Sequence, residues 1–251
     1  MTLAAIIGGS GLTNLKNLEI THREVKRTPF GEPSSPLVYG RLGGQTVVFL
    51  ARHGHGHTIP PHEVNYRANI WALKETGATR VIAVNAVGGI AAALKPGQLV
   101  FPDQIIDYTY ARAHTYFGND QKPVTHIDFS QPYCEDLRQI FIRAARAAGI
   151  AAAERATYAA TQGPRFETIA EIKRLERDGG DIVGMTGMPE TCLARELGLC
   201  YASIAVVANP AAGKAAGEIS LKQIERTLEG GMETVRALLE RIIPLLLTVK
   251  G

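Results

Sequence analysis

The sequence predicts a single α/β domain spanning residues 1–251, with a largely parallel β-sheet flanked by helices. Short apolar runs alternate with amphipathic helical patterns along the whole chain. No repeat, low-complexity tract or linker divides the chain. A length of 251 residues suits one such domain, and 45% hydrophobic with 20% charged residues is typical of a globular protein.

The strands are predicted from apolar runs that are bounded by glycine or polar turn residues. Most of these runs are apolar throughout, which indicates strands buried on both faces of a sheet. The predicted strands are Leu3–Ile7, Thr46–Ala51, Arg80–Val84, Leu99–Ile106, Ala156–Ala160, Ile182–Met185 and Tyr201–Val207.

Helical patterns separate these strands, and some of them carry explicit start signals. Thr168 and Glu171 have the spacing of a capping box, as do Ser220 and Gln223. Pro189 suits the first turn of a helix, where its missing N–H has no partner to lose. The predicted helices are 63–74, 133–148, 168–175, one that begins at Pro189, and a long one over 220–246.

Composition and the chain ends argue against several classes of protein. The net charge of +3 is spread without a basic stripe, so we expect no nucleic-acid partner. No signal-like segment precedes the strand at residue 3, and the apolar run 242–249 is too short to span a bilayer. Cys134, Cys192 and Cys200 are odd in number and lack metal-like spacing, so we expect reduced thiols in a cytoplasmic protein without a membrane partner.

Residues suited to an anion follow several of the predicted strands. In open α/β sheets ligands bind at the carboxyl ends of strands, so these residues are expected to converge. A glycine-rich turn offers backbone N–H groups, an arginine offers a fork, and a threonine at a helix start adds a hydroxyl. Each has an ordinary structural explanation alone, but together they predict a phosphate-sized site. The residues are Ser10, Arg52 with His53, Asn85 with Ala86, and Thr186.

The histidines at positions 53, 55 and 57 raise the question of a metal. Alternation along a strand would place them on one face. No carboxylate or cysteine accompanies them, and Arg52 would repel a cation. We therefore expect no metal, and favour anion binding.

Glu167 and Asn209 can together distinguish one purine from another. The carboxylate accepts from a ring N–H, and the amide both donates and accepts. A 6-oxopurine offers an N1–H donor, O6 and N7, whereas adenine would place a lone pair against the carboxylate. The alternative is a helix-start glutamate and a turn asparagine. The small-residue stretch Pro210–Gly217 that follows is either a substrate lid or a plain connecting loop.

Longer motifs resemble the trimeric purine nucleoside phosphorylase and methylthioadenosine phosphorylase family over nearly the whole chain. This resemblance implies a single α/β domain with a twisted mixed sheet, a homotrimer, and reversible phosphorolysis of a purine nucleoside. Inorganic phosphate would be the co-substrate, with no cofactor. The motifs are Gly8–Leu12, Arg52–Gly54, His57–Ile59, Val64–Leu73, Gly163–Phe166, Met185–Thr186 and Tyr201–Ala205.

The resemblance also implies roles for particular residues. It implies that Phe166 and Met185 pack on the base and the sugar. It places His126, within 126–132, in a neighbouring subunit's site near the 5′ group. The implied phosphate ligands are Ser10, Arg52, His53, Asn85, Ala86 and Thr186.

Two departures from the family's patterns indicate which nucleoside to expect. Methylthioadenosine phosphorylases carry Asp-x-Asp where this chain has Asn209-Pro210-Ala211. They also lack a glutamate at the position of Glu167. At the base side this chain therefore resembles the 6-oxopurine enzymes. Those enzymes place a histidine for the 5′-hydroxyl where this chain has Leu221, with Ile224 one turn on. A leucine leaves a hydroxyl unpaired but accepts a methylthio group.

We therefore expect phosphorolysis of S-methyl-5′-thioinosine. Three alternatives remain: activity on inosine or guanosine, activity on methylthioadenosine, and a nucleoside-binding regulatory protein without catalysis. Leu221 has its own alternative, as the first core residue of its helix.

Overall fold

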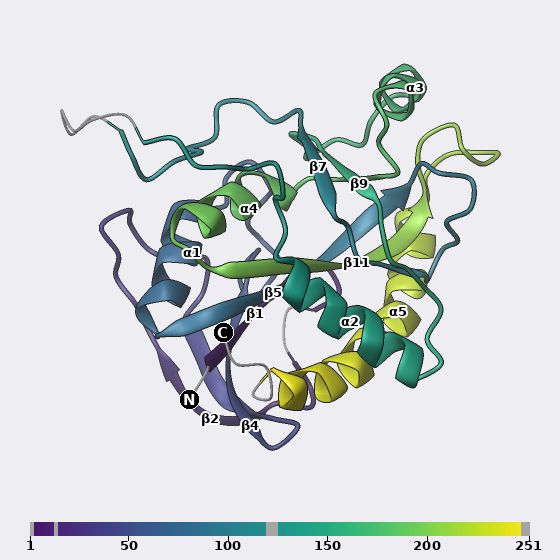
Figure 1. Cartoon of the computed structure of the whole chain (residues 1–251). Coiled ribbons are helices and arrows are strands. Elements are labelled where there is room, and N and C mark those ends of the chain that lie inside the picture. The colour runs from purple at the N-terminus through teal and green to yellow at the C-terminus, as the bar shows by residue number, and fades with distance from the viewer. Residues whose placement is uncertain (1–2, 13–14, 119–124, 247–251) are drawn as a thin grey trace.

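A mixed sheet forms the centre of the molecule in a computed structural model, which describes residues 3–12, 15–118 and 125–246 (Figure 1). The strand order is β2-β3-β4-β1-β5-β10-β9-β7, and β11 lies beside β5 and also pairs with β6. The central pairs β4–β1, β1–β5 and β5–β11 are parallel, which confirms the predicted class. The strands are β1 (Leu3–Gly8), β2 (Glu19–Glu24), β3 (Leu37–Leu42), β4 (Gln45–Ala51), β5 (Ala78–Gly89), β6 (Leu99–Val100), β7 (Gln104–Asp107), β8 (Ala152–Ala153), β9 (Thr157–Ala160), β10 (Ile182–Gly184) and β11 (Cys200–Pro210).

Helices cover both faces of this sheet. One face packs against α2 and α5 and the other against α1 and α4, because buried side chains alternate along the central strands. None of the helices in the described ranges is long and apolar enough to cross a bilayer. The helices are α1 (Tyr66–Glu75), α2 (Glu135–Ala147), α3 (Ile169–Arg177), α4 (Gly187–Glu196) and α5 (Leu221–Leu245).

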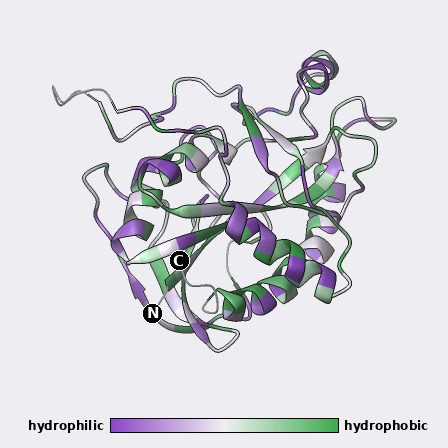
Figure 2. Cartoon of the chain, in the orientation of Figure 1, coloured by the Kyte–Doolittle hydropathy of each residue, from purple (hydrophilic) through white to green (hydrophobic). Residues whose placement is uncertain are grey.

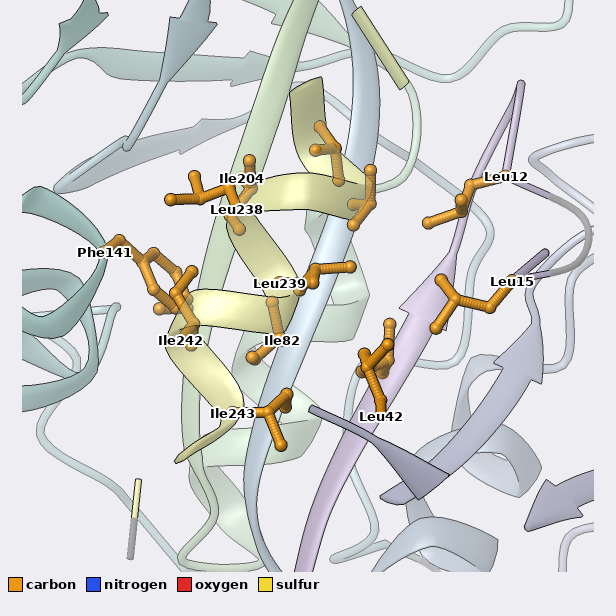
Figure 3. Close-up of a cluster of buried hydrophobic side chains, with 14 of the residues drawn as sticks. Leu12, Leu15, Leu42, Ile82, Phe141, Ile204, Leu238, Leu239, Ile242 and Ile243 are labelled. Carbon is orange, nitrogen blue, oxygen red and sulfur yellow. The ribbon is translucent and has the colours of Figure 1, made fainter. Parts of the chain in front are cut away.

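The largest core cluster lies under α5, whose apolar stripe faces the sheet (Figure 3). Colouring by hydropathy shows the same division, with green strands inside and purple positions on the outer faces of the helices (Figure 2). The labelled core side chains are Leu12, Leu15, Leu42, Ile82, Phe141, Ile204, Leu238, Leu239, Ile242 and Ile243. This packing fixes β5 and β11, the strands that carry Asn85, Ala86 and Asn209.

The helix start signals are mostly confirmed. Thr168 and Glu171 form a complete capping box at the start of α3. Ser220 accepts from the Gln223 N–H at the start of α5, so that half of the second box is present. Pro189 lies inside the first turn of α4, whose N-cap is Thr186.

Several predicted strands differ in extent from those observed. β5 continues to Gly89, so Asn85 lies within a strand rather than after its end. The run predicted over 99–106 is split into β6 and β7, and Pro102 between them has no N–H for a ladder. β2 and β3 were not predicted, since β2 is polar and mostly exposed and lacks an apolar run.

The prediction of reduced thiols is wrong for two of the three cysteines. Cys134 and Cys200 form a disulfide between the N-cap of α2 and the first residue of β11. The backbone N–H of Cys134 donates to the Tyr201 carbonyl, which holds the two segments side by side. Count and spacing carry no information about this proximity, because the pair is 66 residues apart in sequence. Cys192 is a free thiol.

Candidate active site

A cavity of about 1290 Å³ lies where β1, β4 and β10 end, and most of the predicted site residues line it. Its position agrees with the rule that ligands bind at the carboxyl ends of strands. Pro210 lines a smaller adjoining cavity, and His126 is exposed and lines neither of the two. The predicted residues brought together are Ser10, Arg52, His53, Asn85, Ala86, Phe166, Glu167, Met185, Thr186, Asn209, Ala211, Leu221 and Ile224.

Arg52 is fully buried and held by a bidentate ion pair. Its Nε and Nη2 donate to the two carboxylate oxygens of Glu190 at 2.6 and 2.7 Å, and Nη1 donates to the Val84 carbonyl at 3.0 Å. The Tyr201 hydroxyl donates to Glu190 Oε1 at 2.8 Å. Burial by itself lowers the pKa of Arg52, but the Glu190 carboxylate outweighs it and the net pKa is raised. A guanidinium has more N–H donors than these contacts use, so some remain for a ligand.

The turn after β1 approaches this arginine closely. A Cβ at Gly9 would lie 2.7 Å from Arg52 Nη1 and 2.6 Å from the Val84 carbonyl oxygen. Glycine is therefore required for the turn to pass over the guanidinium and place Ser10 at the cavity.

Thr186, Asn85 and Ser203 form a buried chain of hydrogen bonds. Ser203 Oγ donates to Asn85 Oδ1 at 2.6 Å, and Asn85 Nδ2 donates to Thr186 Oγ1 at 2.8 Å. Thr186 is the N-cap of α4, yet its side chain makes no capping bond. The hydroxyl of Thr186 is thus oriented by Asn85 and lines the cavity.

His53 is buried beside Arg52 and is neutral at pH 7. Burial and then the charge of Arg52 lower the pKa of His53 to about 4. Its Nδ1 lies 2.7 Å from the Ile59 carbonyl, which fixes the proton on Nδ1 and leaves Nε2 as an acceptor. His57 lies next to it, with ring centroids 4.7 Å apart, and its pKa is lowered by burial.

The histidines do not share a strand face, because β4 ends at Ala51 and the chain then turns. Ser10 Oγ lies 3.4 Å from His57 Nε2, and His55 is exposed. Within residues 3–12, 15–118 and 125–246, no group of three His, Cys, Asp or Glu side chains is arranged to hold a metal ion.

Glu167 and Asn209, the pair predicted to read the base, line the same cavity. Glu167 Oε1 accepts from Thr161 Oγ1 at 2.6 Å, which leaves Oε2 free for a ligand N–H. Asn209 lies at a β-bulge in β11 and donates from Nδ2 to the Pro210 carbonyl at 2.7 Å. Phe166 is 42% exposed, so the base end is open to solvent.

The first turns of α5 form another wall of the cavity. Leu221 is 64% exposed, so its interpretation as a core residue is wrong. Ile224, Leu228 and Met232 continue the apolar side of this wall, while Glu225 and other carboxylates line it as well. The wall thus offers an apolar surface for a substituent, with charged groups beside it.

The loop between β11 and α5 contacts α3. Lys214 Nζ forms an ion pair with Glu176 of α3, and a Cβ at Gly213 would lie 2.8 Å from the Ile169 side chain. Since α3 begins directly after Glu167, this loop is connected to the base-reading segment through α3.

Sequence reasoning missed the residues that support the site from behind. Arg112 donates to the carbonyls of Met185, Met188 and Gln162 at 2.8, 2.6 and 2.7 Å. These bonds join the loop between β9 and α3 to the start of α4. A signal existed for one pair: Tyr201 and Ser203 are polar at alternate positions of an otherwise apolar buried strand. The residues missed are Thr161, Glu190, Tyr201, Ser203 and Arg112.

A cavity with a buried arginine, a helix-start threonine and a carboxylate–amide pair on a mixed sheet fits a phosphate-using enzyme of the nucleoside phosphorylase fold. The chain belongs to the phosphorylase superfamily, whose model matches residues 4–244. This confirms the family that the motifs resembled.

Known relatives are similar over nearly the whole chain. A protein of Pseudomonas syringae pv. tomato named "probable S-methyl-5′-thioinosine phosphorylase" is 56% identical, covering 97% of this chain and 99% of its own length. The 6-oxopurine nucleoside phosphorylase of Pyrococcus furiosus is 45% identical, with 98% and 94% covered. Methylthioadenosine phosphorylase from Schistosoma mansoni, solved in complex with adenine, superposes with a TM-score of 0.96 at 36% identity, covering 100% of this chain and 93% of that one.

Proposed function

We propose that this protein catalyses the reversible phosphorolysis of S-methyl-5′-thioinosine to hypoxanthine and 5-methylthioribose 1-phosphate, a step of purine salvage. The observation that carries the proposal is one cavity that combines a phosphate-suited set around Arg52, the pair Glu167 and Asn209, and the apolar wall of Leu221 and Ile224. The relative at 56% identity carries the corresponding name.

The base end favours a 6-oxopurine. Thr161 occupies one oxygen of Glu167, and the other can accept from the N1–H of hypoxanthine. The lone pair at N1 of adenine would face the same carboxylate and would be repelled. Asn209 has Oδ1 free while Nδ2 donates to Pro210, so Oδ1 can accept from a protonated N7.

The reaction exchanges one bond to C1′ for another. The bond from C1′ to N9 breaks, its electron pair leaves with the purine, and the sugar acquires oxocarbenium character. Asn209 and Glu167 stabilise the leaving purine, which takes a proton from water at N7, and the hydrogen phosphate returns one proton to water when it forms the ester. A phosphate oxygen, held by Arg52, Thr186 and backbone N–H groups, then bonds to C1′. No metal or organic cofactor enters this sequence.

The sugar end favours a 5′-methylthio group over a hydroxyl. Leu221 and Ile224 offer no hydrogen-bond partner, so a 5′-hydroxyl placed there loses water without compensation. Phe166 and Met185 supply apolar surface for the base and sugar.

We further propose a cytoplasmic homotrimer. The exposed position of His126, away from its own chain's cavity, suits a residue that reaches a neighbouring subunit's site. Light scattering of the purified protein tests the trimer. Cell fractionation tests the location. This test is needed because Cys134 and Cys200 form a disulfide.

Base release from S-methyl-5′-thioinosine, methylthioadenosine, inosine and guanosine, each with and without phosphate, tests the function. We expect phosphate-dependent hypoxanthine release, fastest from S-methyl-5′-thioinosine. Fastest cleavage of methylthioadenosine would refute the roles of Glu167 and Asn209, and fastest cleavage of inosine or guanosine would refute the role of Leu221. Binding without any turnover would point to a regulatory protein.

A further inference from the structure

Ser203 lies behind the phosphate-suited residues and does not line the cavity. It is 2% exposed, as is Asn85, and it joins Asn85 through a 2.6 Å hydrogen bond from Oγ to Oδ1. Asn85 in turn donates to Thr186, the N-cap of α4, and both Asn85 and Thr186 line the cavity. Ser203 can therefore influence a ligand only through these two side chains.

The donor and acceptor properties of the three side chains set the direction of the hydrogen bonds between them. A carboxamide oxygen only accepts and its NH₂ only donates, so the bond from Ser203 to Oδ1 turns the NH₂ toward Thr186. The Thr186 oxygen then accepts from Asn85, and its single hydrogen is left for another acceptor. The Thr186 side chain caps no N–H of α4 and lines the cavity, and the buried Tyr158 hydroxyl lies beside it.

We propose that Ser203 is a positioning residue that makes Thr186 a hydrogen-bond donor to the bound phosphate. The inference rests on the proposed function, because it assumes that phosphate is the anion at Thr186. Phosphate oxygens accept hydrogen bonds, so they need the Thr186 hydrogen to point toward them. Without the Ser203 hydroxyl the Asn85 amide can rotate, present Oδ1 to Thr186 and draw that hydrogen away from the ligand.

Steady-state kinetics of Ser203→Ala test the proposal. We expect the KM for phosphate to rise about 10-fold or more, the typical effect of losing a hydrogen bond to a charged group. The KM for the nucleoside should stay within about 2-fold, because the base and sugar contacts do not depend on this chain. Ser203→Thr keeps the hydroxyl and should restore a phosphate KM near that of the wild type.

A double-mutant cycle separates positioning from general damage. In a Thr186→Val background, Ser203→Ala should raise the phosphate KM clearly less than it does in the wild type, because the hydroxyl that it positions is gone. Equal effects of Ser203→Ala with and without Thr186 would overturn the proposal. Thr76→Val is a control, since it removes a partly buried hydroxyl that makes two hydrogen bonds just before the start of β5, at the opposite end from Gly89, and it should leave the phosphate KM unchanged.

Two further outcomes remain distinguishable. If wild-type base release does not depend on phosphate, the proposed function fails. If wild-type release depends on phosphate but Ser203→Ala has a normal phosphate KM, the positioning role alone fails. Should Ser203→Ala not fold, Ser203→Cys retains the volume with a weaker donor and should give an intermediate KM; a wild-type KM for it would refute the inference.

Discussion

The two ends of the cavity differ in how completely the protein has built them. At the proposed phosphate end, Arg52, Asn85 and Thr186 are buried and each is held by other side chains. At the nucleoside end, Phe166 and Leu221 are 42% and 64% exposed. Preformed donors cost no reorganisation when an anion arrives, whereas the nucleoside end has surface left to bury on binding.

This difference suits the two ligands. Phosphate is small and charged, so its affinity depends on donors fixed in advance. A nucleoside carries apolar surface, which can cover the exposed Phe166 and Leu221 side chains when it binds. Substitutions at the phosphate end should therefore affect folding as well as activity, while those at the nucleoside end should affect activity alone.

Glu190→Ala should have the largest effect on stability. It leaves the fully buried guanidinium of Arg52 without its carboxylate, which typically costs about 3–5 kcal/mol. Urea denaturation measures this loss. Arg146→Ala breaks the exposed pair with Glu154 and should change the unfolding free energy little. Equal losses in the two variants would contradict a prebuilt phosphate end.

Asn209→Ala should have the next largest effect, which is a loss of turnover rather than of folding stability. Removing one preorganised group that stabilises developing charge typically lowers kcat by about 100- to 1000-fold. Asn209 is only partly buried and its side chain bonds to its own neighbour, so the melting temperature should hardly move. Near-normal turnover would eliminate it as the group that stabilises the leaving purine.

Lowering the pH should reduce the unfolding free energy of the protein through His53. Its pKa is lowered to about 4 in the folded state, so between about pH 6.5 and pH 4 the unfolded chain binds the extra proton. The contribution of neutral His53 to the unfolding free energy is therefore fully present above pH 6.5, and about 3 kcal/mol is lost as the pH drops through this window.

The measurement for His53 is the unfolding free energy against pH for the wild type and for His53→Asn. The variant keeps a donor for Ile59 but cannot titrate, so its acid slope should be shallower. Parallel slopes would show that His53 is not held neutral by the fold.

Leu221→His should give the smallest effect, a change of preference. A histidine there can bond a 5′-hydroxyl, so the ratio of kcat/KM for inosine to that for S-methyl-5′-thioinosine should rise about 10-fold. Leu221→Met keeps an apolar side chain and should leave the ratio unchanged. Because Leu221 is largely exposed, neither change should alter the melting temperature. A ratio unaffected by histidine would place the 5′ group elsewhere.

Sequence patterns predicted the parts of the fold and site that are local. Apolar runs located the buried strands, the Thr168 box located α3, and residues after strand ends located a set that lines one cavity. The resemblance to a known family supplied the motifs between them. These features are readable because each depends on residues near one another in the chain.

The parts that sequence patterns missed depend on distant residues. Glu190 meets Arg52 across 138 residues, and Ser203 meets Asn85 across 118. The disulfide between Cys134 and Cys200 likewise cannot be predicted from the spacing of the cysteines. The polar strand β2 lacked any apolar run because most of it is exposed.

Arg112 has an electrostatic consequence for the whole site. Within the described residues its hydrogen-bond acceptors are neutral: the carbonyls of the two site loops, the Gln162 side chain and the Tyr66 hydroxyl. The charge of Arg52 is cancelled by Glu190, whereas Arg112 is a cation that forms no ion pair with a carboxylate among the described residues. The field of Arg112 reaches both the incoming phosphate and the departing purine anion from behind the cavity wall, as a standing positive potential that no ligand displaces.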